Sequence, residues 1–392
     1  MPATERSTPW RAAGFALALV VGLAAPGLTP ARPAHDLAPV DAQAQRLVDR
    51  YRLPGASIRL ASGAGVVHRK TYGGYTGDER LAIASASKWL SALTLARLVE
   101  RGDLRWDSTV GEFFPEASAA MRPITLGQLF SHTSGMFAAE RPCLADRQKT
   151  LQACAREILA LPLASPPGTV FAYGGNSMQV AGAMAELATG QAWDDLFIAQ
   201  MVLPLGLTDT DWNTSGARFG YVRNTNPRIA GGARSTLDDY GRVLDMLLAG
   251  GLHQGQSFLR ADTLAAMALD RTVGLVIAFT PVSDYDFGYG IGQWVEARDA
   301  WGATYRVSSP GAFGFTPWVD WQNGSSGIIA VAGNGGLMRD DLTALEGLCL
   351  QQLDFVRYTR SNPKLRSPAI VPLRKPVQAK PRPTLDGRGR AL

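Results

Sequence analysis

Strand-like segments lie at both ends of this 392-residue chain, and helix-like segments fill the stretch between them. Patterns of alternating and β-branched residues predict strands at 55–62, 65–72, 287–296, 304–308, 313–321 and 326–333. Apolar residues at helical spacing predict helices at 41–51, 85–101, 148–160, 177–189, 193–202, 236–249 and 340–358. If the strands from both ends share one sheet, the helical block becomes a lobe inserted into an α/β domain. A cleft between lobe and sheet is then the expected place for a small-molecule site.

The first 34 residues have the pattern of a secretory signal peptide. Arginines precede an apolar run of 14 residues, and small residues with prolines follow up to Ala34. A membrane anchor is the alternative, but a run this short is below the length of a spanning helix. The chain is therefore predicted to be exported, to the periplasm or the medium, without a stable membrane span.

The net charge of +5 is distributed unevenly along the chain. Residues 362–392 contribute +7 and hold six prolines with few apolar residues, which predicts a disordered basic tail. Residues 1–34 contribute +2, so the body of the chain, residues 35–361, carries −4. A body without a basic surface is not expected to bind nucleic acid.

All three cysteines lie in the body of the chain. In an oxidising compartment, a disulfide between Cys143 and Cys154 would close a small loop and stabilise the fold by about 2–3 kcal/mol. Cys349 falls in the apolar pattern of the last predicted helix and is expected to be a buried free thiol. None of the three has neighbours that would activate a nucleophile.

A serine and a lysine three residues apart, Ser85 and Lys88, stand at the start of a predicted helix. The chain has 33 arginines but 6 lysines, and a buried lysine can lose its proton near neutral pH whereas arginine cannot. Positions i and i+3 share a helix face, so Lys88 is predicted to act as a base for the Ser85 hydroxyl. The alternative is a serine N-cap followed by a solvated lysine.

Two later segments have features of a catalytic site. A Pro-Gly turn places Tyr173 just before a helix, and a phenol beside a lysine cation is predicted to have a lowered pKa and to relay a proton. The second segment places Gly311 and Ala312 at the start of a strand. Glycine lets a ligand approach the backbone closely, so the N–H of its neighbour can stabilise an oxyanion.

These three segments, in this order, resemble the serine β-lactamase and penicillin-binding protein superfamily. The likeness is closer to its branch of class C β-lactamases, D,D-carboxypeptidases and family VIII esterases. The sequence His132-Thr-Ser-Gly resembles that branch's characteristic segment, and Pro204-Leu-Gly-Leu-Thr-Asp-Thr resembles its Pro-Leu-Gly-Met-x-x-Thr turn. The resemblance covers about residues 41–355 and implies an α/β (α+β) fold, with an antiparallel sheet flanked by helices and an inserted helical lobe.

By position, the resemblance implies a role for each motif residue. Ser85 attacks a carbonyl group and becomes acylated, and Lys88 and Tyr173 share the removal of its proton, with the choice of base left open. The N–H groups of Ser85 and Ala312 hold the oxyanion, and water completes the hydrolysis. No cofactor and no metal is implied.

Two motifs depart from the family pattern. Relatives have Tyr-x-Asn, whereas Asn176 stands one place late here, so Asn176 or Gln179 is a candidate for substrate contact. Relatives have Lys-Thr-Gly or His-x-Gly, whereas this chain has Ser309-Pro-Gly. The cation that would pair with a substrate carboxylate is missing. Carboxylate recognition is therefore predicted to be about tenfold weaker, unless Arg234 or Arg306 replaces that cation.

Other candidate residues have simpler interpretations. His132 is predicted to hold a loop, and the four histidines lack metal-ligand spacing. The tryptophans at 294, 301, 318 and 321 are expected to pack in and around the C-terminal sheet rather than to line the acyl pocket. Gly288-Tyr-Gly-Ile-Gly is expected to mark a strand pressed closely by another element.

The sequence thus predicts an exported serine hydrolase that cleaves a small-molecule ester, amide or peptide bond. A D,D-carboxypeptidase, D-aminopeptidase or weak β-lactamase is the alternative within this class. A non-catalytic sensor of cell-wall fragments or β-lactams is the alternative of another class, which the two altered motifs leave open. The oligomeric state stays open.

Overall fold

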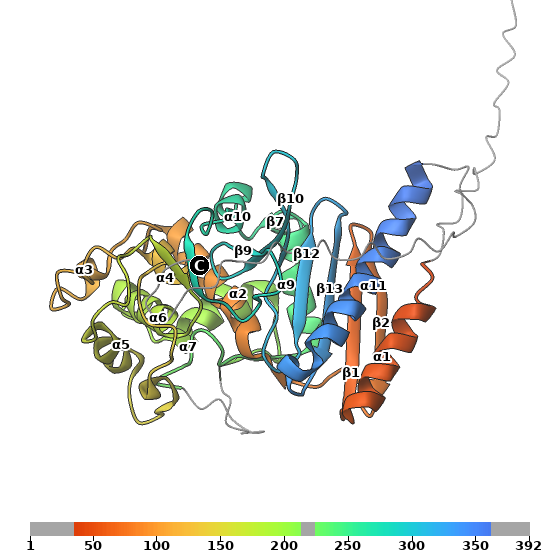
Figure 1. The fold of residues 1–392 in the computed structure, drawn as a ribbon, viewed down its shortest axis with the longest axis horizontal. Helices are drawn as coiled ribbons and strands as arrows, with labels where there is room; N and C mark the ends of the chain where they lie inside the picture. Colours follow the sequence, from red (N-terminus) through yellow and green to blue (C-terminus); the bar gives the residue numbers. More distant parts are fainter. Residues whose placement is uncertain (1–34, 213–223, 362–392) are drawn as a thin grey trace, which may run out of the picture. The chain divides into compact units, whose positions relative to one another are not determined.

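The structure, a computed structural model, describes residues 35–212 and 224–361. The predicted signal peptide and the predicted tail lie outside these residues. Within them, the two ends of the chain meet in one antiparallel sheet of order β2-β1-β13-β12-β11-β10-β9 (Figure 1), which confirms the predicted architecture. The strands are β1 (Gly55–Ser62), β2 (Gly65–Gly73), β9 (Gly288–Tyr289), β10 (Trp294–Arg298), β11 (Thr304–Ser308), β12 (Thr316–Asp320) and β13 (Ser325–Val331).

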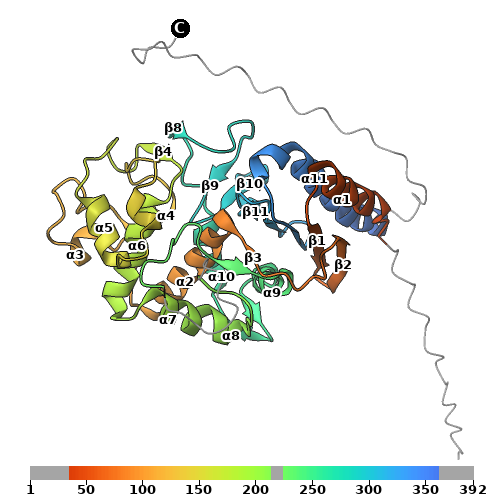
Figure 2. The same ribbon diagram turned by 90° about the horizontal axis from the view of Figure 1, so that it is seen from below.

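Helices cover both faces of the sheet (Figure 2). On one face lie α1 (Ala38–Tyr51) and α11 (Gly335–Ser361), whose apolar side chains pack on β1 and β13. On the other face lies α9 (Leu237–Leu248), which contacts β1, β12 and β13. Burial on both faces explains why every residue of β13 is buried, and why its sequence is apolar or small throughout.

The middle of the chain forms the predicted helical lobe around α2, whose first half is almost entirely buried. Its helices are α2 (Ser87–Arg101), α3 (Val110–Phe113), α4 (Leu126–Phe130), α5 (Leu151–Leu159), α6 (Asn176–Thr189), α7 (Trp193–Phe197), α8 (Leu203–Leu205) and α10 (Ala261–Ala268). Short strand pairs connect the lobe internally: β3 (Leu81–Ala82) with β5 (Arg234–Ser235), β4 (Val170–Ala172) with β8 (Val276–Phe279), and β6 (Leu252–His253) with β7 (Gln256–Ser257). These pairs could not be predicted from the sequence, because two- to four-residue strands leave no periodic pattern.

The strand predicted at 287–296 is divided by Gly292. This residue has φ +70°, and a Cβ atom there would lie 2.8 Å from the backbone oxygen of Lys88 and 2.6 Å from Ala92. Only glycine tolerates this combination of a left-handed backbone and a close approach. The expectation that this segment is pressed by another element is confirmed: the element is α2, so the edge of the sheet lies directly against the helix that carries Lys88.

The cysteines are arranged as predicted. Cys143 and Cys154 form a disulfide, and Cys349 is a buried free thiol on α11. In the part of the chain that the structure describes, no helix combines the length and the apolar content needed to cross a bilayer.

Candidate active site

Ser85 and Lys88 lie where the sheet meets the helical lobe. Ser85 is the middle residue of a 3₁₀ turn, Ala84–Ala86, and Lys88 belongs to the first turn of α2. Lys88 is 4% exposed, and its Nζ atom lies 3.0 Å from Ser85 Oγ and 2.8 Å from the backbone oxygen of Ala230. The hydroxyl and the amine are therefore in direct contact, and the alternative of a solvated lysine is wrong.

Burial changes the acidity of Lys88. It lowers the pKa of the ammonium group from 10.5 to about 7, chiefly because the charged form loses its hydration. Glu140 raises this pKa and Arg228 lowers it, and the two side chains form an ion pair beside the site. Near neutral pH a large fraction of Lys88 is therefore uncharged and can accept a proton.

Tyr173 follows β4 and lies against the same two residues. Its hydroxyl hydrogen bonds to Ser85, and Lys88 Nζ lies 4.6 Å from the centre of its ring. The prediction of a lowered pKa is wrong. Burial raises the pKa of Tyr173, and the hydrogen bond to Ser85 only partly offsets this. Tyr173 therefore remains a phenol, which favours Lys88 as the base and leaves Tyr173 as a donor.

Aromatic packing holds Tyr173 in place. Trp294 stacks on its ring at 5.2 Å, and the ring of His132 lies 4.5 Å away on another side. The Nδ1 atom of His132 accepts the Gly174 N–H (3.4 Å), and the His132 carbonyl accepts the Ala172 N–H (2.9 Å). His132 thus has the loop-holding contacts predicted for it. Trp294 packs here and also lines the cavity, whereas Trp301 is 91% exposed, so the packing expected for the tryptophans is wrong for Trp301.

The Ser309-Pro-Gly segment contacts the backbone of Ser85. Ser309 Oγ donates to the backbone oxygen of Ser85 (3.1 Å). A Cβ atom on Gly311 would lie 2.1 Å from the backbone oxygen of Ile83. Glycine is therefore required by the close approach of the chain itself, and Gly311 also lines the cavity, so an approach of a ligand there stays a prediction. Ala312 lines the cavity, and among the described residues its N–H has no hydrogen-bond acceptor.

Asn176 does not line this cavity. Its amide donates to the backbone oxygens of Phe137 and Ala139 (2.9 Å each), and its Oδ1 atom accepts the Arg141 N–H (3.0 Å). A shift of one residue rotates a helical side chain by about 100°, and here it turns the amide toward the loop before α5. The expectation that Asn176 contacts the substrate is therefore wrong.

Gln179, the other candidate for substrate contact, also hydrogen bonds to the protein itself. Its amide donates to Asn226 Oδ1 (2.9 Å) and to the Pro227 oxygen (3.0 Å), and it accepts the Ile229 N–H (3.1 Å). The next residue, Ala230, supplies the carbonyl that Lys88 contacts. Gln179 therefore fixes the segment beside Lys88 rather than contacting the cavity.

The two arginines proposed as substitutes for the missing cation are engaged elsewhere. Arg234 forms a two-point ion pair with Asp211 (3.0 and 2.8 Å). Arg306 pairs with Glu296 (3.3 Å) and lies 3.7 Å from Asp320. The cation that lines the cavity is Arg339 on α11, which forms no ion pair with any of the described residues.

The cavity above Ser85 has a volume of about 410 Å³. One wall is a face of α11. This wall was not predicted, because the apolar pattern of a helix does not show which of its faces borders a site. The only available signal was that its residues recur at helical spacing. The residues on this wall are Gly335, Gly336, Arg339, Leu342, Thr343 and Glu346. The facing wall contains Trp294 and Glu296 of β10 and the loop residues Val282, Tyr285 and Phe287.

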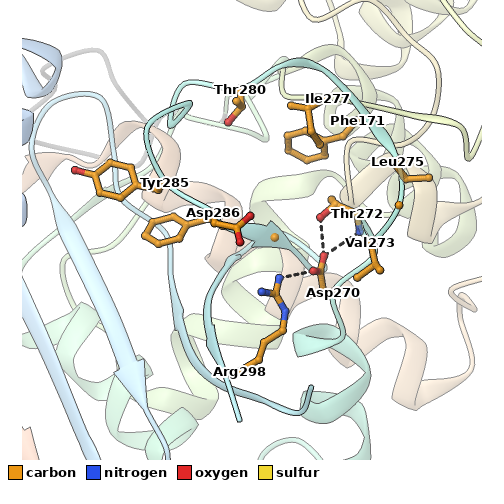
Figure 3. A pocket seen from close by; sticks show the side chains of 13 residues that line it. Phe171, Asp270, Thr272, Val273, Leu275, Ile277, Thr280, Tyr285, Asp286 and Arg298 are labelled. Carbon is orange, nitrogen blue, oxygen red and sulfur yellow. Dashed lines mark hydrogen bonds and ion pairs between the residues drawn. The ribbon is translucent and has the colours of Figure 1, made fainter. Parts of the chain in front are cut away.

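A second cavity of about 400 Å³ adjoins the first and shares Tyr285 and Phe287 with it. Figure 3 shows its polar lining, in which Asp270 bonds to Thr272 and forms an ion pair with Arg298. These groups already satisfy one another, and Asp270 also accepts the Tyr289 N–H (3.2 Å), so they hold the 270–272 turn against β9 and β10.

Comparisons with known proteins agree with this geometry. Residues 40–349 match the Beta-lactamase family model. The chain is 33% identical to penicillin-binding protein 4 of Amycolatopsis lactamdurans over 40% of its length, and 28% identical to esterase EstB of Burkholderia gladioli over 43%. These matches span 44% and 50% of the two relatives.

A solved β-lactamase candidate from Bacteroides dorei DSM 17855 superimposes with a TM-score of 0.70 and 32% identity. The match covers 79% of this chain and 98% of that one. The fold, the Ser85–Lys88 contact and the family match lead to one conclusion. The chain belongs to the β-lactamase family of serine hydrolases.

Proposed function

We propose that this protein hydrolyses small-molecule esters or amides through an acyl-Ser85 intermediate. The observation that supports this most directly is the 3.0 Å contact between Ser85 Oγ and Lys88, whose pKa is about 7. Neutral Lys88 takes the hydroxyl proton as Oγ bonds to the substrate carbonyl carbon. The proton then passes to the leaving oxygen or nitrogen as its bond to carbon breaks. A water molecule, deprotonated in the same way, attacks the acyl group and releases the acid and the Ser85 hydroxyl.

Tyr173 and Ala312 supply the remaining groups. Because burial keeps Tyr173 protonated, its hydroxyl can donate to the leaving group and regain a proton from Lys88. The Ala312 N–H, together with that of Ser85, stabilises the negative charge that develops on the carbonyl oxygen. Ser309 fixes the Ser85 backbone through its hydrogen bond at 3.1 Å.

Neutral esters are the favoured substrates, because Ser309 stands where relatives carry the cation that pairs with a β-lactam or D-Ala carboxylate. Arg339 is the observation that favours a second candidate, a D,D-carboxypeptidase, D-aminopeptidase or weak β-lactamase, since it can pair with a carboxylate on the substrate. The sensor remains a third candidate because two motifs are altered.

We also propose that the protein is exported. The support is the signal-like pattern of residues 1–34 and the Cys143–Cys154 disulfide, since disulfides persist mainly in oxidising compartments. Cell fractionation with N-terminal sequencing of the mature chain tests this, and recovery of the uncleaved chain from the cytoplasm would contradict it.

The proposed activity predicts a specific pattern with three probes. Purified protein and Ser85→Ala are each incubated with p-nitrophenyl butyrate, a fluorophosphonate and a fluorescent penicillin. We expect butyrate hydrolysis and fluorophosphonate labelling, both absent in Ser85→Ala, and penicillin turnover at least about tenfold slower. Comparable turnover of the penicillin would favour the second candidate. Labelling without turnover would favour the sensor, and no labelling would contradict the role of Ser85.

Removing either partner of the Glu140–Arg228 ion pair beside Lys88 is predicted to shift the pH profile of kcat/KM, in opposite directions for the two partners. Only neutral Lys88 is active, so kcat/KM should rise with pH through about 7. Glu140 raises this pKa, so Glu140→Gln should move the midpoint down by a few tenths of a unit, and Arg228→Gln should move it up. Rates with p-nitrophenyl butyrate between pH 5 and 9 measure this. Glu116→Gln, which breaks a surface ion pair with Arg156, is the control. Shifts of equal sign would exclude Lys88 as the titrating group.

A further inference from the structure

The cavity has an acidic end that the proposed hydrolysis does not use. We propose that this end binds the ammonium group of an ω-aminoacyl chain, so that the preferred substrates are esters or amides whose acyl group ends in a primary amine. The inference rests on the proposed function, because it concerns the acyl group that Ser85 receives. It is carried by Glu296 on β10 and Glu346 on α11, which both line the cavity.

A β-bulge in β10 brings Glu296 to the cavity. The pairing with β11 shifts between Val295 and Ala297, and Glu296 is the extra residue. Bulges re-aim side chains and are frequent next to active sites. Trp294, two residues earlier, stacks on Tyr173 and also lines the cavity. Glu296 therefore lies two residues further along β10 than Trp294, which borders Tyr173.

The face of α11 places Glu346 at the same end of the cavity. The helix starts beside the oxyanion donor, because the Gly335 N–H donates to the Ala312 oxygen (2.8 Å), and it packs on the sheet at β13. Arg339 follows one turn later. Glu346 comes seven residues after Arg339 on the same helix face, about 10 Å further along the axis. The acidic end is thus the end away from the oxyanion donor.

Negative charge exceeds positive charge at this end. The guanidinium of Arg306 is shared between Glu296 (3.3 Å) and the fully buried Asp320 (3.7 Å). Among the described residues, Glu346 forms no ion pair within bonding distance, and its buried Oε1 atom has no hydrogen bond. Burial and the neighbouring Glu296 raise the pKa of Glu346, and Arg306 lowers it in part. A buried polar atom left without a partner is destabilising, and a bound donor removes that cost.

A primary ammonium on a methylene chain fits these surroundings. Trp294, Leu342 and Val282 line the cavity between its two ends and would contact methylene groups. An ammonium group has three donors and no acceptor, which suits carboxyl oxygens, whereas a carboxylate would face Glu296 and Glu346. Arg339 repels a cation placed nearer Ser85. The preference for an amine should therefore require a long acyl chain.

Matched esters test the preference. The pair p-nitrophenyl 8-aminooctanoate and p-nitrophenyl nonanoate differs by an ammonium in place of a methyl group. The pair 3-aminopropanoate and butanoate is the short-chain counterpart. For the wild type, we expect kcat/KM to be at least about tenfold higher for the long amine than for its methyl partner, and no higher for the short amine.

Variants connect the preference to the acidic end. Glu346→Gln is expected to lower the amine-to-methyl ratio of the long pair at least about tenfold. Asp340→Asn is the control, because it removes one charge from an exposed position of the same helix and should leave the ratio unchanged. If Glu346→Gln does not fold, Glu296→Gln serves the same purpose. A wild-type ratio at or below one, or a ratio that neither variant changes, overturns the inference.

A binding measurement separates this inference from the proposed function. Ser85→Ala is titrated calorimetrically with 8-aminooctanamide and with nonanamide. Tighter binding of the amine supports the acidic site even if no ester is hydrolysed, in which case the proposed function alone fails. Hydrolysis of nonanoate with no preference in either experiment overturns the inference and leaves the proposed function standing.

Discussion

Replacing Lys88 by methionine is expected to lower kcat/KM for p-nitrophenyl butyrate at least about 10³-fold and, at the same time, to stabilise the fold. Activity falls because methionine fills the same buried space but cannot take the proton of Ser85, 3.0 Å away. Tyr173 cannot replace it, since burial raises the pKa of Tyr173 and keeps it protonated. Activity above about 1% of the wild type would exclude Lys88 as the base.

Stability rises because a buried lysine is costly near neutral pH. Its pKa falls from 10.5 to about 7 on folding, so between these values the unfolded chain binds a proton that the folded chain does not. At pH 7 this costs about 4 kcal/mol, and the cost fades as pH rises toward 10.5. Losing the contact to the Ala230 oxygen offsets part of the gain, which leaves about 2 kcal/mol.

Thermal unfolding measured from pH 7 to 10 tests this second effect. The Tm of Lys88→Met should exceed that of the wild type at pH 7, and the difference should narrow as the pH rises. Lys149→Met is the matched control, because Lys149 is partly exposed and pairs with Glu157 at the surface. It should change neither activity nor the pH dependence of the Tm. A constant difference in Tm across this range would contradict the assigned pKa.

Gly311→Ala is expected to lower kcat/KM about 10²- to 10³-fold, the usual cost of losing an oxyanion donor. The new Cβ atom would lie 2.1 Å from the oxygen of Ile83. Ile83 cannot move away freely, since its oxygen accepts the Ala86 N–H and its N–H binds the Ala233 oxygen. Either the turn that holds Ser85 or the one that holds Ala312 must therefore shift, which separates the nucleophile from the N–H.

The same substitution at an open glycine separates this effect from a general effect of alanine. Gly347 lies on α11, and a Cβ atom there meets nothing within 4 Å. Gly347→Ala should leave kcat/KM unchanged and stabilise the helix slightly. Comparing fluorophosphonate labelling rates and Tm for both variants distinguishes a displaced oxyanion site from unfolding. Full activity of Gly311→Ala would show that the close approach at Ile83 is not maintained in solution.

Contacts that are local in sequence could be predicted best. Ser85 and Lys88 are three residues apart, so helix geometry alone brings their side chains together, and the structure places them in contact. Gly292 is a similar case, because a glycine-rich strand indicates a close neighbour even when that neighbour is unknown. The strands at the two ends of the chain were predicted to share one sheet from their patterns and from the family resemblance.

Predictions that depended on orientation or environment were less secure. The pKa of Tyr173 was expected to fall because only its charged neighbour was considered, and burial reversed the sign. Asn176 was one residue from its position in relatives, and that rotation aimed its amide at the loop before α5. Arg234 and Arg306 were plausible cations by composition, but each is paired with an acidic residue on another segment: Arg234 with Asp211, and Arg306 with Glu296 on the neighbouring strand β10.

The sequence alone predicted the chemistry of this site: Ser85 as the nucleophile, Lys88 as its base, and the segments that surround them. These follow from residue types and short spacings, for which backbone geometry is enough. The tertiary structure decided the surroundings of that chemistry, including the burial that brings the pKa of Lys88 to about 7 and the face of α11 that carries Arg339 and Glu346. The burial of Lys88 and the orientation of α11 depend on contacts between elements more than 200 residues apart. No local sequence pattern encodes which side chains then face the same cavity.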